Sequence, residues 1–171
     1  MRIALIADTH GYLDPRIADA IRGTDILVHA GDVGAGIEAE IAPLAARVVI
    51  VHGNNDPSDS GWPESEVLAL PGGTLAVMHG HQWPAKTRHR KLRECFPDAR
   101  AIVCGHSHHR LLDTDIEPVV LNPGAAGKSR AYGGRGYLSL HINAAGDWAI
   151  ETHVLDAPEA SELSMRGGAT I

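Results

Sequence analysis

The chain begins with a short, continuous apolar run that ends abruptly in polar residues. Residues 3–7 are all apolar, and Asp8 and His10 follow at once. A run of this length is typical of a strand that is buried on both faces, rather than of an amphipathic helix. Functional side chains of parallel sheets collect in the loops after the carboxyl ends of strands. Asp8 and His10 therefore fit either half of a metal site or a capping aspartate beside a surface histidine.

The patterns of the first half predict alternating strands and helices. A helix is expected from its cap at Asp14 to Gly23, and the apolar residues 26–28 predict a second strand, after which Asp32 follows. A strand–helix–strand unit places its two strands parallel to each other. We therefore expect Asp32 to emerge at the same edge of the sheet as Asp8.

This alternation occurs once more along the chain. A helical segment is expected over 36–46, interrupted or shifted by Pro43, and a third strand over 48–51 leads into Asn54. Residues 57–65 are rich in Pro, Ser, Gly and Asp, and are expected to form a loop. Three successive strands thus end in polar residues on one edge.

The second half has a more antiparallel pattern. Strands over 66–70 and 74–78, joined by a Pro-Gly-Gly turn, predict a β-hairpin whose second strand ends in His79 and His81. A basic amphipathic helix is expected over 84–96. Two packed sheets, each with helices outside, would bring the polar strand ends of both halves together.

A further buried strand over 101–104 ends in His106 and His108. We expect a single domain over 1–156 and a loose tail over 157–171. The predicted fold class is α/β (α+β mixed), a four-layer α-β-β-α sandwich of two packed mixed sheets flanked by helices. The remaining short strands are expected over 119–121, 137–142 and 148–154.

Composition narrows the function classes. The 171 residues are 44% hydrophobic and 21% charged, as expected for one globular domain, and no apolar stretch is long enough to span a membrane. Cys95 and Cys104 are too few for a disulfide scaffold, so we expect reduced thiols in a cytoplasmic protein. The net charge of −6 argues against a broad nucleic-acid-binding face. The 11 histidines, by contrast, suggest metal chemistry.

Five predicted strand ends carry seven side chains that suit metal ligation. Their mixture of oxygen and nitrogen donors suits Mn²⁺, Fe²⁺, Ni²⁺ or Zn²⁺, and seven ligands suffice for two ions if one carboxylate bridges them. Some of these residues have simpler interpretations, because an Asn-rich turn tolerates left-handed backbone and loop histidines are often solvent-facing. The seven are Asp8, His10, Asp32, Asn54, His79, His106 and His108.

The motifs D-x-H, G-D, G-N-x-D, G-H after a strand, and G-H-x-H occur in this order from Met1 to about Val154. In this the chain resembles the calcineurin-like metallophosphoesterase superfamily, and its compact size, MHGH and LNPG most resemble the small microbial phosphodiesterases. The resemblance implies a dinuclear-metal-dependent phosphoesterase, more a phosphodiesterase than a phosphomonoesterase. Its nucleophile would be a hydroxide that bridges the two metals.

The resemblance also implies how the ligands divide between the metals. One ion would be held by Asp8, His10, Asp32 and His108, and the second, through the bridging Asp32, by Asn54, His79 and His106. Mn²⁺ is the ion we expect, with Ni²⁺, Fe²⁺ or Zn²⁺ as alternatives. The implied partner is a small phosphate-ester substrate, and homo-oligomerisation stays open.

One position departs from the family pattern. Many relatives have His after the G-N pair, where it can protonate the leaving group, whereas this chain has Asn55, whose amide is no general acid near neutral pH. We therefore place His81 with Asp32 and Asn54 among the catalytic residues, as the candidate proton donor. An exposed histidine without a role at that position, or a substrate whose leaving group needs little help, is the alternative.

A function of another class shares the expected fold. One retromer subunit is similar in fold but lacks a competent site, so a non-catalytic protein-binding scaffold is the alternative hypothesis. All seven expected ligand positions hold suitable residues, which favours the enzyme. A metal-dependent amide hydrolase would share the metals but would not predict this order of motifs.

Overall fold

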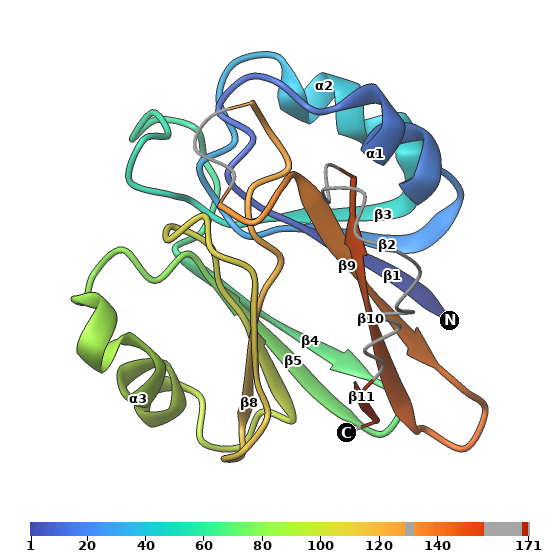
Figure 1. Ribbon diagram of the computed structural model, residues 1–171, viewed down its shortest axis with the longest axis vertical. Helices are drawn as coiled ribbons and strands as arrows, with labels where there is room; N and C mark the ends of the chain where they lie inside the picture. Colours follow the sequence, from blue (N-terminus) through green and yellow to red (C-terminus); the bar gives the residue numbers. More distant parts are fainter. Residues whose placement is uncertain (129–131, 156–168, 171) are drawn as a thin grey trace.

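The computed structural model describes residues 1–128, 132–155 and 169–170, which form two packed β-sheets (Figure 1). In spatial order, the six-stranded sheet contains β11 (Ala169–Thr170), β10 (Trp148–Val154), β9 (Gly136–Ile142), β1 (Arg2–Ile6), β2 (Thr24–His29) and β3 (Ala45–Ile50). The five-stranded sheet contains β4 (Ser65–Leu70), β5 (Gly73–Met78), β6 (Ala101–Val103), β8 (Val119–Asn122) and β7 (Leu111–Asp113).

Both sheets are mixed. Strands β1, β2 and β3 run parallel to one another, as predicted, and so do β5, β6 and β8. The other pairings are antiparallel, including the predicted hairpin of β4 and β5. The carboxyl ends of the parallel strands of both sheets lie at the same end of the molecule (Figure 1).

Helices cover the outer faces of the two sheets. Helices α1 (Pro15–Ile21) and α2 (Ile37–Ile41) pack on the six-stranded sheet, and α3 (Ala85–Cys95) packs on the five-stranded sheet (Figure 1). The side chain of Asp14 accepts a hydrogen bond from the backbone N–H of Arg16 and so caps α1 as predicted. The predicted four-layer α-β-β-α sandwich is confirmed.

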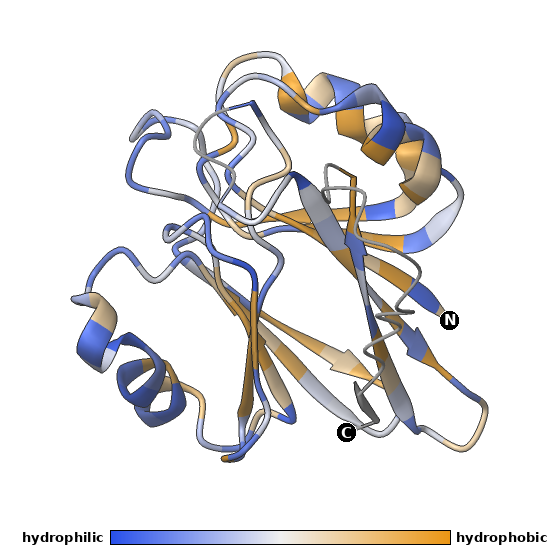
Figure 2. Cartoon of the chain, viewed as in Figure 1, coloured by the Kyte–Doolittle hydropathy of each residue, from blue (hydrophilic) through white to orange (hydrophobic). Residues whose placement is uncertain are grey.

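The alternation of side chains along β1 explains why its sequence is apolar throughout. Ile3 and Leu5 point into the core between the two sheets, whereas Ala4 and Ile6 point toward the helices. All four are buried. Figure 2 shows the same division, with apolar strands inside and the hydrophilic surface of α3 outside. In the described part of the chain, no helix combines the length and the apolar character needed to cross a membrane.

Two details differ from the sequence-based expectations. The helix expected over 36–46 is shorter, because α2 passes into a 3₁₀ turn, η1 (Ala42–Leu44), and Ala45 already pairs with Thr24 in the sheet. Pro43 lies within that turn, where it cannot donate the hydrogen bond of a continuing helix. Strand β7 was not predicted, since three residues at a sheet edge leave no periodic pattern.

The loose tail expected over 157–171 falls mostly on residues outside the described ranges. Only Ala169 and Thr170 are described there, and their backbones pair with Ile150 and Ala149 of β10. At these two positions the chain forms strand β11 at the edge of the six-stranded sheet.

Trp148, at the start of β10, links the six-stranded sheet to the turn between β4 and β5 of the other sheet, at the end opposite the polar strand ends. Its side chain is fully buried, and its Nε1–H donates to the carbonyl oxygen of Pro71 at 2.7 Å. Trp148→Ala should therefore lower the free energy of unfolding by about 3–5 kcal/mol, measured by urea denaturation. Ile116→Ala, at a side chain that is 60% exposed, is the control and should change it by less than about 0.5 kcal/mol. Equal losses in the two variants would contradict this role.

Candidate metal centre

The predicted polar residues meet where the carboxyl ends of β1, β2, β3, β5 and β6 converge. Backbone hydrogen bonds join the loops there, because Asp8 N–H donates to Gly31 at 3.1 Å and His10 N–H donates to Asp32 at 3.0 Å. The loops of the second sheet are joined in the same way, from Gly105 N–H to the carbonyl of His79 at 3.1 Å. The side chains of the two sheets thus face one another from fixed loops.

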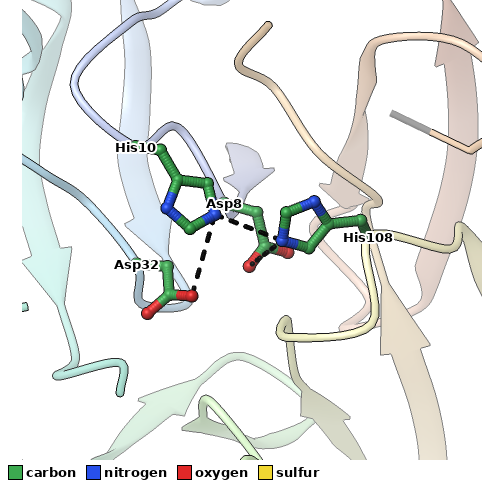
Figure 3. A group of neighbouring side chains, drawn as sticks. All are labelled: Asp8, His10, Asp32 and His108. Carbon is green, nitrogen blue, oxygen red and sulfur yellow. Dashed lines mark hydrogen bonds and ion pairs between the residues drawn. The ribbon is translucent and has the colours of Figure 1, made fainter. Parts of the chain in front are cut away.

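One group of side chains comprises Asp8, His10, Asp32 and His108 (Figure 3). One ligand atom from each lies within 4.8 Å of those of the other three. His108 Nε2 lies 3.5 Å from a carboxylate oxygen of Asp8, and His10 Nε2 lies 3.8 Å from one of Asp32 and 3.2 Å from His108 Nε2. This spacing can hold one metal ion.

A second group adjoins the first and shares Asp32 with it. It comprises Asp32, His79 and His106, again with ligand atoms within 4.8 Å of one another. His79 Nε2 lies 3.4 Å from Asp32 Oδ2, and Asn54 Oδ1 lies 2.9 Å from His106 Nδ1. The structure therefore brings all seven predicted ligands together, with Asp32 common to both groups.

The backbone is strained at most of these residues. Among the described residues, only five that are not glycine have positive φ, with values between 48° and 67°. Residues other than glycine rarely adopt a positive φ. Those that do are often found at functional sites, where the surrounding structure enforces the conformation. All five belong to the seven predicted ligands, namely Asp8, His10, Asp32, His106 and His108.

Two buried polar atoms in the centre lack a hydrogen-bond partner. They are Asp8 Oδ2 and His79 Nε2. The other ring nitrogen of His79 lies 2.7 Å from the carbonyl oxygen of Ala30, so Nδ1 donates to that oxygen and Nε2 faces the centre. Buried polar atoms are normally satisfied, and a cation between them would satisfy both. Oxygen and imidazole donors without a thiolate fit a first-row divalent ion.

The two carboxyl groups have opposite pKa shifts. Burial raises the pKa of Asp8 to about 7. Burial also acts to raise the pKa of Asp32, but His79 and the hydrogen bonds from Asn55 outweigh it and hold this pKa well below its usual value. Burial, with the charge of His79 beside it, lowers the pKa of His106 to about 4. Near neutral pH, Asp32 is therefore ionised and His106 is neutral, as ligands must be.

Asp56 organises the loops around Asp32. Its carboxylate accepts hydrogen bonds from the backbone N–H groups of Asp32, Val33, Gly34 and Gly53, at 2.7–3.1 Å. A Cβ atom at Gly53 would lie only 2.3 Å from Asp32 Oδ1, so only glycine fits there. In the sequence, Asp56 stands out only as the acidic residue of the G-N-x-D motif.

Asn55 has a role that the sequence did not reveal. Its backbone N–H donates to Asp32 Oδ1 at 2.8 Å, and its side-chain amide donates to Asp32 Oδ2 at 2.7 Å. The residue thus orients both oxygens of the shared carboxylate. Its position next to Asn54 was a weak signal, because the contact joins two different loops.

Two buried polar residues, Thr9 and Asn122, form hydrogen bonds that support the loops carrying the candidate ligands. The hydroxyl of Thr9 donates to the carbonyl of Val33 at 2.7 Å and accepts from His29 Nε2 at 2.8 Å. The amide of Asn122 donates to the carbonyl of Gly105 at 2.9 Å and so supports the loop that leads to the last two histidines. Asn122 belongs to the LNPG motif, which was the available signal, whereas nothing in the sequence distinguished His29.

His81 lies beside the second group without belonging to it. Its ring centroid is 5.5 Å from that of His79 and 6.3 Å from that of His106. Burial and the neighbouring His79 lower its pKa, and its Nδ1 is buried without a hydrogen-bond partner. His81 belongs to neither group of converging ligand atoms, and its assignment as proton donor stays a prediction.

A cavity of about 310 Å³ opens onto the centre. Its wall is mostly polar and contains members of both ligand groups. The lining residues are Asp32, Asn54, Asn55, His106, Ser107, His108 and Tyr132.

Comparisons with known proteins bear on the family and the fold of the chain. A probable metallophosphoesterase of Methanocaldococcus jannaschii is 29% identical over 132 residues, which cover 73% of this chain and 68% of that protein. The fold resembles that of Entamoeba histolytica Vps29 complexed with Zn²⁺, with a TM-score of 0.74, 23% identity, and coverage of 88% and 91% of the two chains. It also resembles YfcE, a phosphoesterase from Escherichia coli, with a TM-score of 0.67, 19% identity, and coverage of 91% and 94%. Residues 1–145 match the calcineurin-like phosphoesterase superfamily domain, and the chain therefore belongs to that metal-dependent family.

Proposed function

We propose that this protein is a dinuclear-metal-dependent phosphoesterase that acts on phosphodiesters. The observation that carries the proposal is the shared position of Asp32, an ionised carboxylate that belongs to both groups of converging ligand atoms. When bound, two divalent ions, for which we propose Mn²⁺, supply Lewis acidity and a hydroxide nucleophile by lowering the pKa of a water between them.

The side chains of the centre divide the remaining work. Asp8, His10 and His108 would hold one ion, His79 and His106 the other, and Asp32 would bridge both. The carbonyl of Ala30 fixes the His79 ring so that Nε2 faces inward. Asn54 offers its amide oxygen beside His106, and its amide N–H can donate to a phosphate oxygen of the substrate.

The charge of the cavity supports a diester rather than a monoester. Near neutral pH a phosphodiester carries one negative charge, whereas a phosphomonoester carries up to two. Among its seven described lining residues the cavity has no Lys or Arg that could compensate a second charge. We further propose that His81 protonates the leaving group, since the amide of Asn55 cannot do so and is occupied by Asp32.

The alternative function is a protein-binding scaffold. The likeness to Vps29, at 23% identity, supports it only through the fold. The strained ligand residues and the unpaired atoms of Asp8 and His79 favour a metal-using enzyme, because a scaffold has no need of them. We also propose a cytoplasmic location, which the two free cysteines support.

Asp32→Asn tests the shared carboxylate. The variant keeps the shape of the side chain but loses its charge, so we expect metal-dependent hydrolysis of bis-p-nitrophenyl phosphate to fall by roughly a hundredfold or more. The assay uses metal-stripped protein titrated with Mn²⁺. Asp19→Asn, at an exposed residue of α1, is the control and should leave turnover unchanged. A folded protein that binds metal but is inert toward the diester with several ions would favour the scaffold.

His81→Ala tests the proposed proton donor. We expect kcat with bis-p-nitrophenyl phosphate to fall while the affinity for Mn²⁺ stays within about twofold, because His81 lies outside both ligand groups. The loss should grow with leaving groups of higher pKa. His79→Ala, at a proposed ligand, should lower metal affinity as well. Equal loss of turnover and of metal affinity in His81→Ala would rule out the assignment.

The pKa of Asp8 leads to a pH-dependent prediction. In the unfolded chain this pKa has its ordinary value of 3.8, and burial raises it to about 7 in the folded, metal-free protein. The folded state therefore holds the proton more tightly, and the contribution of Asp8 to stability is lost as the pH rises from about 4 to about 7. Metal-free Asp8→Asn should be more stable than metal-free wild type at about pH 7.5 and should lose this advantage toward pH 4.

Urea denaturation of both proteins at several pH values measures this difference. With saturating Mn²⁺ the order at about pH 7.5 should reverse, because ionised Asp8 then binds the cation. A difference between the metal-free proteins that does not change with pH would contradict the buried, protonated carboxyl.

A further inference from the structure

Tyr132 lines the same cavity as the candidate ligands. It lines this cavity of about 310 Å³ together with members of both groups, including Asp32, His106 and His108. Among the described lining residues, Tyr132 is the only aromatic side chain that is not an imidazole of the centre or its loop. The residue is 51% exposed, although aromatic residues make up only 4% of the chain.

The ring of Tyr132 is supported from one side. The His109 ring stacks on it with a centroid distance of 4.3 Å and an interplanar angle of 3°. The backbones of the two residues form a parallel β-bridge. The guanidinium of Arg110 donates to the carbonyls of Gly133 at 3.3 Å and Gly134 at 3.0 Å, directly after Tyr132. The tyrosine is therefore held in place before any ligand arrives.

We infer that Tyr132, with His109 behind it, forms an aromatic wall that stacks against a planar ring carried by the substrate. This inference rests on the proposed function and narrows its substrate class to phosphoesters that bear an aryl group or a nucleobase. The phosphate binds at the centre, and the ring lies against Tyr132. Stacking of this kind contributes about three- to tenfold in affinity.

Of the described side chains that line the cavity, Tyr132 is the one suited to select for a planar ring. The other lining side chains are carboxylate, amide, hydroxyl and imidazole groups, most of which belong to the centre or bind it. They recognise the phosphate and do not distinguish one organic group from another. A planar ring and a saturated ring of the same size would therefore differ mainly in their contact with Tyr132.

The test compares two competitive inhibitors with six-membered rings, one planar and aromatic and the other saturated and puckered. We expect phenyl phosphate to inhibit hydrolysis of bis-p-nitrophenyl phosphate about fivefold more strongly than cyclohexyl phosphate. Tyr132→Phe should keep this ratio, and Tyr132→Leu should reduce it to about one. Tyr12→Leu is the matched control, because Tyr12 packs under Lys128 at 4.2 Å, is not among the residues lining the cavity, and should keep the ratio.

A binding measurement separates this inference from the proposed function. The fluorescence of 2-aminopurine riboside 5′-monophosphate is quenched when its base stacks, so we expect quenching with wild type and little with Tyr132→Leu. If no metal supports hydrolysis, the proposed function fails and the quenching alone decides the aromatic wall. If wild type does not prefer phenyl phosphate to cyclohexyl phosphate, or if Tyr132→Leu retains that preference, the inference that Tyr132 stacks against the substrate is wrong. A phenyl preference without quenching would support it for aryl esters.

Discussion

The candidate centre depends on the hydrogen bonds that the carboxylate of Asp56 accepts from two neighbouring loops. Three of its four backbone donors follow β2 and the fourth, Gly53, follows β3. Hydrogen bonds to an ionised acceptor are about twice as strong as neutral ones. They hold Asp32 at a φ of 56°, a conformation that a free aspartate avoids. Because both ligand groups share Asp32, a loss of these hydrogen bonds that moved Asp32 would disturb both groups.

The buried carboxyl group of Asp8 costs folding free energy near neutral pH until a cation is present, whereas the ionised Asp32 does not. Asp8 and Asp32 are buried close together, and burial favours the protonated form of Asp8 while His79 and Asn55 favour the ionised form of Asp32. The strained backbone at five ligand positions adds to this cost. The aliphatic cores between and outside the two sheets offset it. Such a division, with a stable scaffold and a strained site, is common in enzymes.

Much of the fold, and the meeting of the candidate ligands at one edge, could be predicted because both follow from local patterns. Apolar runs that end in polar residues revealed the strands, and parallel pairing then placed Asp8 and Asp32 on one edge. Features that depend on long-range packing could not be predicted from the sequence. The pairing of Ala45 with β2 ends the second helix early, Asn55 acts across two loops, and Tyr132 reaches the cavity from a loop 24 residues beyond His108. No spacing rule connects such residues before the sheets are packed.

The properties of Asn55 and of Tyr132 both favour an aromatic alcohol as the leaving group of the proposed reaction. The amide of Asn55 is committed to Asp32 and is no acid, so this position provides no proton for a leaving alkoxide. An aromatic alcohol has a pKa of about 10, against roughly 16 for water and alkyl alcohols, and departs with far less protonation. The aromatic wall of Tyr132 and His109 would bind that kind of leaving group. If the proposed function holds, a centre that lacks an acid at Asn55 and has a stacked ring beside its ligand groups would favour aryl esters, and the proposed role of His81 would become more important as the leaving group becomes more basic.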